Sequence, residues 1–157
     1  MFEELSTMEM VLRGALASVL GGAIGWNREL RNKAAGLRTM MLVALGSAGA
    51  MMAVVEVVAL AGANEEIQLD PLRVISGIIG GIGFLGAGSI IQSRGSVRGL
   101  TTAATIWAAA CIGIACGLGI YRLALVLTGF VLVTLIAVTA LKGDILPDKN
   151  GGDDDTD

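Results

Sequence analysis

Five long apolar segments constrain this 157-residue chain more than any other feature of its sequence. A helix needs about 20 residues to cross the roughly 30 Å hydrocarbon core of a bilayer. Hydrophobic residues make up 54% of the chain and charged residues only 16%, a surplus that a soluble domain of this size cannot bury. We therefore predict an all-α, polytopic transmembrane bundle over residues 1–142, with spans at Met8–Trp26, Thr39–Leu60, Val74–Ser93, Leu100–Tyr121 and Leu123–Leu141.

The positions of the basic residues predict how the bundle is oriented, because cytoplasmic loops carry an excess of Lys and Arg. One side of a five-span bundle carries Arg28, Arg31, Lys33, Arg38, Arg94, Arg98, Lys142 and Lys149. The other side carries Arg13, Arg73 and Arg122, together with most of the acidic residues that precede the tail. We expect the N-terminus outside and the C-terminus in the cytoplasm, where residues 143–157 form a disordered acidic tail.

The predicted third span is rich in glycine: Gly77, Gly80, Gly81, Gly83, Gly86 and Gly88. Small residues let helices approach closely inside lipid, where packing drives helix association. Because these glycines fall on more than one helical face, we expect the span to be tightly packed at the centre of the bundle. The alternative is a broken helix that lines a pathway, as in many transporters.

Two further glycine pairs have the spacing of helix contact motifs. They are Gly21-x-x-x-Gly25 in the first span and Gly113-x-x-x-Gly117 in the fourth. The spacing predicts helix–helix contacts, and it leaves open whether these form within the chain or between copies.

Two predicted cytoplasmic loops end in similar sequences, Ala35–Thr39 and Arg98–Thr102. In each, a glycine provides a turn and a threonine is placed to cap the next helix. Helix N-termini carry a positive partial charge, so these turns and their arginines form a cationic face. That face either binds an anion, a phosphate or a lipid headgroup, with Glu29 orienting an arginine, or serves only as positive-inside anchoring. Its candidate residues are Arg28, Glu29, Gly36, Arg38, Thr39, Arg98, Gly99, Thr101 and Thr102.

On the predicted outer face, Asp70-Pro71-x-Arg73 precedes the third span. Asp70 can cap the helix, and Pro71 suits its first turn. Arg73 either pairs with Asp70 or extends its charged end to the interface.

The sequence disfavours several classes of function. It has no histidine, so no Ser-His-Asp, Cys-His or zinc-ligand arrangement can be assembled, and we predict no catalytic residue, metal site or cofactor. No ionisable residue is expected at mid-depth, where proton relays and cation transporters commonly need one. This disfavours Mg²⁺ transport, although carbonyls and hydroxyls can still line a pore. A nucleic-acid partner is not expected, because no basic helix face with interleaved aromatic residues is present.

Several sequence blocks together resemble the transmembrane domain of the MgtC/SapB family of bacterial inner-membrane proteins. The resemblance covers nearly the whole chain from the first span to the fifth. In chain order the blocks are Arg28-Glu29, Ala35-Gly36-Leu37-Arg38-Thr39, Asp70-Pro71-x-Arg73, Gly81-Ile82-Gly83-Phe84-Leu85-Gly86-Ala87-Gly88 and Val97-Arg98-Gly99-Leu100-Thr101-Thr102-Ala103-Ala104-x-x-Trp107.

The resemblance implies a non-enzymatic multi-pass protein of the bacterial inner membrane that helps cells adapt to low Mg²⁺ by regulating other membrane proteins. The alternative is a transporter or channel for Mg²⁺ or another small ion or solute. It also adds Trp107 to the residues of helix packing or of a pathway. Partners would be the lipid bilayer, another membrane protein and a second copy, with a dimer favoured. Many members continue into a soluble cytoplasmic domain after the fifth span, and we expect an acidic tail in its place here.

Overall fold

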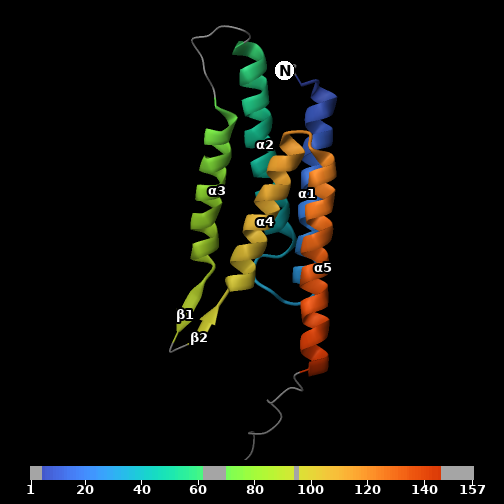
Figure 1. Cartoon of the computed structure of the whole chain (residues 1–157), viewed down its shortest axis with the longest axis vertical. Coiled ribbons are helices and arrows are strands. Elements are labelled where there is room, and N and C mark those ends of the chain that lie inside the picture. Colours follow the sequence, from blue (N-terminus) through green and yellow to red (C-terminus); the bar gives the residue numbers. More distant parts are fainter. Residues whose placement is uncertain (1–4, 62–69, 94–95, 146–157) are drawn as a thin grey trace, which may run out of the picture.

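Five helices form the bundle in a computed structural model that describes residues 5–61, 70–93 and 96–145. Every one of them is long and apolar enough to cross a membrane. They run alternately up and down, so the basic loops gather at one end, here called the basic end (Figure 1). The all-α, polytopic fold is confirmed, whereas the side of the membrane that the basic end faces stays a prediction. The helices are α1 (Thr7–Glu29), α2 (Leu37–Ala61), α3 (Pro71–Gly88), α4 (Leu100–Gly117) and α5 (Tyr121–Ile145).

The third helix has different ends from those predicted. Asp70 Oδ1 accepts a 2.9 Å hydrogen bond from the Leu72 N–H, so the expected cap starts α3 at Pro71. The helix ends at Gly88, where the Ser89 hydroxyl donates back to the Gly86 carbonyl at 2.7 Å. The predicted extension of this span to Ser93 is wrong, because the backbone there pairs in a hairpin.

A short antiparallel hairpin connects α3 to α4 at the basic end (Figure 1). Its strands are β1 (Ile91–Ser93) and β2 (Ser96–Arg98), and Ile91 is paired with Arg98. The backbone groups that a helix would bond internally are satisfied here across the two strands.

The Gly21-x-x-x-Gly25 pair lets α1 approach the backbone of α2. A Cβ atom at Gly21 would stand 2.6 Å from the Met40 carbonyl oxygen, and one at Gly25 would stand 2.7 Å from Leu37 Cα. Real Cβ atoms do not come this close to backbone atoms, so both positions require glycine. The predicted contact motif is confirmed, and it acts within the chain.

The second glycine pair brings α4 against the same helix from another side. A Cβ at Gly113 would overlap the Ala44 carbonyl oxygen, and one at Gly117 would stand 2.5 Å from that of Ala48. Helix α2 therefore packs between α1 and α4, with its backbone almost in contact with theirs. Small residues permit such close packing of helices in lipid. Around this contact lie the buried residues Ala17, Leu20, Ile24, Ala44, Ala48, Ile112, Ala115, Cys116 and Ala124.

Helix α4, and not α3, lies at the centre of the bundle. Of the membrane-spanning window of α4, 61% of residues are buried, against 6% for α3. Gly86 is the buried residue of α3, where it faces Ala103 of α4. The expectation that the glycine-rich span is central and tightly packed is wrong for the single chain. At its other glycines, a Cβ atom would meet no other atom within 4 Å, so these positions are not in close contact with another helix.

The predicted boundary between membrane domain and tail, at residues 142 and 143, falls inside α5. This helix runs to Ile145, past the predicted end of the fifth span at Leu141. Residues 146–157, which make up most of the predicted acidic tail, lie outside the described residues.

Replacing Gly113 with Ala should destabilise the bundle, because the added methyl group must displace the α2 backbone. We expect the free energy of unfolding to fall by about 1–3 kcal/mol. Thermal unfolding in detergent measures the change, followed in a Cys111→Ser background by a thiol-reactive dye that labels the buried Cys116. The control is Gly129→Ala in α5, where the new methyl group meets open space and should cost nothing. Equal losses in the two variants would show that the close contact is not required.

Candidate functional site

A buried arginine organises the basic end. Arg28, at the end of α1, is only 3% exposed. Its guanidinium donates to the carbonyl oxygens of Ala34 at 2.6 Å and Ala35 at 3.0 Å. It also donates to the hydroxyls of Thr102 at 2.6 Å and Thr105 at 3.4 Å in α4. Arg28 therefore joins three segments: α1, the loop that follows it, and the first turns of α4.

These contacts leave Arg28 little capacity to hold a ligand. A guanidinium has five N–H donors, and four of them are used in the bonds just described. The Thr105 hydroxyl can accept from Arg28 because it donates its own proton to the Thr101 carbonyl at 2.6 Å. The arrangement is a completed hydrogen-bond network, so Arg28 has a structural role at this end.

Glu29 caps α2. Its Oε2 accepts the Leu37 N–H at 2.7 Å, and a carboxylate at a helix N-terminus is stabilising. The expectation that Glu29 orients an arginine is not met: within the described residues it has no ion pair. Gly36 leaves room for this carboxylate, since a Cβ there would stand 2.5 Å from Glu29 Oε2. Glu29 precedes the start of α2 by eight residues and reaches it across a short loop, a contact that residue type alone does not reveal.

Gly99 begins α4 in a conformation that favours glycine. Its φ is +91°, and a Cβ would overlap the carbonyl oxygen of Ser89. The N-cap makes no side-chain hydrogen bond, so the predicted threonine cap of α4 is wrong. At the start of α2, Glu29 and not Thr39 is the cap, because its carboxylate accepts the Leu37 N–H. Thr39 and Thr101 are both exposed, whereas Thr102 is buried on Arg28.

The predicted cationic residues differ in their surroundings. Arg38 and Arg98 are exposed, and within the described residues neither side chain forms a hydrogen bond or ion pair. Arg28 is buried in its own network. The candidate face therefore separates into an inner structural part and an outer part that is open to solvent or headgroups.

At the opposite end, sequence reasoning missed a second arginine contact. Arg13 Nη1 donates to the Gly117 carbonyl at 2.8 Å and so caps the last turn of α4. Beside it, Gly119 has a φ of +76° and makes the tight turn into α5. Arg13 and Arg28 lie fifteen positions apart on α1, and they form hydrogen bonds with opposite ends of α4. That spacing was visible in the sequence, but nothing in it pointed to α4.

The predicted outer-face residues have modest roles. Asp70 caps α3 as expected. Arg73 is exposed, and no ion pair with Asp70 occurs in the part of the chain that the structure describes. Trp107 on α4 is 47% exposed, so it is not a buried packing residue of the single chain.

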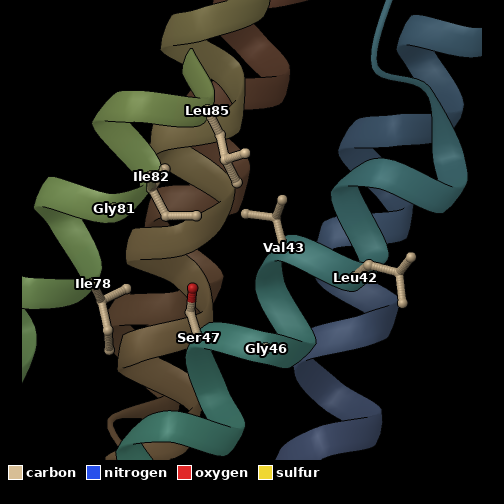
Figure 2. Close-up of a pocket in the computed structure, with 8 residues that line it drawn as sticks. All are labelled: Leu42, Val43, Gly46, Ser47, Ile78, Gly81, Ile82 and Leu85. Atoms are coloured by element: carbon tan, nitrogen blue, oxygen red, sulfur yellow. The ribbon is translucent and has the colours of Figure 1, made fainter. Parts of the chain in front are cut away.

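A groove of about 390 Å³ lies between α2 and α3. Figure 2 shows side chains from the two helices facing each other across it, with the Ser47 hydroxyl among them. Of the predicted glycines, Gly81 lines the groove and Gly86 packs on α4, whereas Gly77, Gly83 and Gly88 meet open space. The lining is apolar apart from that serine: Leu42, Val43, Gly46, Ser47, Ile78, Gly81, Ile82 and Leu85.

Five apolar helices, ionic groups that cap helix ends and a groove within the apolar region define a polytopic membrane protein. The comparison with known families makes the assignment more specific. The model of the MgtC family matches residues 15–143, which is most of the chain. The chain belongs to the MgtC family, as its sequence blocks indicated.

Individual relatives agree with this assignment. The chain is 45% identical over 125 residues to the "Protein MgtC" of Brucella abortus strain 2308, covering 80% of this chain and 48% of the relative. It is 42% identical over 117 residues to the "Putative magnesium transporter YhiD" of Escherichia coli K12, covering 74% and 54%. It is 37% identical over 144 residues to "Protein SapB" of Bacillus subtilis strain 168, covering 90% and 61%.

The chain thus spans about half to three fifths of the length of these relatives. No solved structure matches it. The family match and the five membrane-spanning helices agree with each other.

Replacing Arg28 with Ala should destabilise the basic end, because two carbonyls and two hydroxyls lose a charged donor. We expect a loss of about 2–4 kcal/mol in the free energy of unfolding. Arg28→Lys should recover part of the loss, since an ammonium group reaches fewer of the four acceptors. The exposed neighbour Arg31 provides the control, and Arg31→Ala should change stability by less than about 0.5 kcal/mol. Thermal unfolding in detergent that is unchanged in Arg28→Ala would rule out the structural role.

Proposed function

We propose that this protein is a non-enzymatic, multi-pass protein of the bacterial inner membrane that contributes to adaptation to low Mg²⁺ by binding and regulating other membrane proteins. Family membership supports a magnesium-related role, since one relative carries the name of a putative magnesium transporter. The observation that carries the regulatory part is the position of α3, which stands at the edge of the bundle with one face unused.

The arrangement of charged groups favours a regulator over a transporter. Arg13, Arg28, Glu29 and Asp70 each bond to the end of a helix or to a neighbouring loop. The groove is lined by aliphatic side chains and one hydroxyl, whereas Mg²⁺ takes carboxylate and water oxygens in near-octahedral geometry. Helices α1, α2 and α4 pack too closely for a hydrated path between them.

The unused face of α3 is suited to helix–helix contact. On an α-helix, Gly77, Gly80, Phe84 and Ala87 share the side opposite Gly86, which faces α4. Cβ atoms at Gly77 and Gly80 would meet open space, and Phe84 is 80% exposed. Small residues beside one large aromatic residue form a notch and a projection, into which a transmembrane helix of a partner can pack.

Purified protein in liposomes should move no Mg²⁺, because its closed helical core offers no hydrated route. A fluorescent Mg²⁺ indicator inside the vesicles measures the flux, and protein-free vesicles set the background. Deletion of the gene should still impair growth at low Mg²⁺. Substantial flux would support the transporter alternative, in which case bulky replacements at Gly83 or Gly86 beside the α3 pathway should reduce it.

Gly80→Leu should abolish support of growth at low Mg²⁺, because its side chain fills the notch on α3. The protein should still fold, since a Cβ at this position meets nothing within 4 Å. Gly129→Leu is the matched control: it places the same side chain on an open site of α5 and should leave growth normal. Growth assays of the deletion strain carrying each variant, with membrane levels compared, give the answer. Normal growth with Gly80→Leu would remove α3 as the partner surface.

The dimer expected from the sequence stays a prediction. Light scattering of the purified protein in detergent measures the mass of the protein component and decides it. The partner proposal does not depend on the result, because the growth assay compares variants in the same oligomeric background.

A further inference from the structure

The groove between α2 and α3 has a length that matches the depth of one leaflet of the membrane. Leu42 and Ser47 lie five and ten residues into α2, about 8 and 15 Å from its start at a rise of 1.5 Å per residue. On α3, Leu85 and Ile78 lie three and ten residues from the end at Gly88, about 5 and 15 Å. Half of the hydrocarbon core is about 15 Å thick. The groove therefore runs from the basic end to the membrane midplane.

The shape and lining of the groove suit an alkyl chain. Its volume of about 390 Å³ falls in the range of small-molecule sites, about 300–1,000 Å³. It is open to the surface, and two of its lining residues, Leu42 and Leu85, are 66% and 54% exposed; Leu85 lies at the top of the groove in Figure 2. Gly46 and Gly81 leave room where side chains would otherwise close it.

An exposed cation lies in the first turn of α2, one turn before the groove begins. Arg38 lies four residues before Leu42, so the two share one side of α2 and are one turn apart. Arg38 is exposed, and no hydrogen bond or ion pair engages its side chain within the described residues. Glu29 reaches the same helix end, but its carboxylate is held by the Leu37 N–H. Arg31 and Lys33 in the adjoining loop, both exposed, leave the surroundings net positive.

From this placement we infer that the groove is a binding site for an anionic phospholipid, with one acyl chain between α2 and α3 and the phosphate on Arg38. The nearby charge argues for this occupant, because one phospholipid molecule supplies both an alkyl chain for the groove and an anion for Arg38. An arginine fork matches phosphate oxygens in geometry as well as charge. The site is distinct from the outer face of α3, so both can be occupied together.

Native mass spectrometry of the full chain in detergent, titrated with phosphatidylglycerol or phosphatidylcholine, tests the charge near the groove. The wild type should retain one phosphatidylglycerol about fivefold more tightly than phosphatidylcholine, the effect of one basic residue at a membrane surface. Arg38→Gln should remove this preference, and Arg38→Lys should keep most of it. Arg122→Gln is the control, since it removes one exposed charge at the opposite end of the bundle and should leave the preference intact.

Filling the groove tests the acyl-chain half of the site. Gly46→Leu and Gly81→Leu each place a side chain where a Cβ meets open space, so both proteins should fold. Each should lose the retained lipid, whichever headgroup it carries, while Gly129→Leu should keep it.

Three results would overturn the inference. They are equal affinity of the wild type for the two lipids, equal loss of preference in Arg38→Gln and Arg122→Gln, and unchanged lipid retention in both filled-groove variants. A dimer that dissociates in Gly81→Leu without loss of lipid would instead place a second copy in the groove. None of these results bears on the growth phenotype of Gly80→Leu, so this inference and the proposed function can fail separately.

Discussion

The rest of the structure depends on the near-contact between the backbone of α2 and the glycines of α1 and α4. Inside a bilayer, burial of apolar surface gives no advantage over lipid, so helices associate through van der Waals contact and hydrogen bonds. The four glycines at 21, 25, 113 and 117 maximise that contact by removing the side chains that would hold the helices apart. Helices α3 and α5 pack against the sides of this unit.

Two arginines of α1 stabilise the ends of α4 for different electrostatic reasons. Arg13 meets the C-terminal carbonyl of Gly117, where the helix dipole attracts a cation. Arg28 lies at the N-terminal end, where the dipole opposes it, and there it needs the hydroxyls of Thr102 and Thr105 and two loop carbonyls as acceptors. The functional consequence is that Arg28, Thr102 and Thr105 maintain the fold at the basic end. The remaining predicted residues of the pattern are exposed, namely Arg38, Thr39, Arg98 and Thr101.

Hydrophobic length and glycine spacing were enough to predict five spans and the helix contacts of α1 and α4, because both depend on local sequence. Asp70 and Pro71 predicted the start of α3 for the same reason. The position of α3 could not be predicted, since glycine permits close packing without requiring it, and a partner must be present for contact to occur. The roles of Arg28 and Glu29 were also missed. Each depends on acceptors or donors far along the chain or across a loop, which residue type alone does not reveal.

The hydrogen bonds that Arg13 and Arg28 form with the two ends of α4 have a consequence for how the protein is made. Both arginines enter the membrane with the first helix, but their partners at Thr102, Thr105 and Gly117 are synthesised 74, 77 and 104 residues later. Charged groups at the ends of a lone span are costly until they are paired or reach the interface. Translation order and packing order therefore differ, because α3 is inserted before α4 and yet stays outside the core. The unit of α1, α2 and α4 can close only after the fourth helix has been inserted, so its assembly is a late event in synthesis.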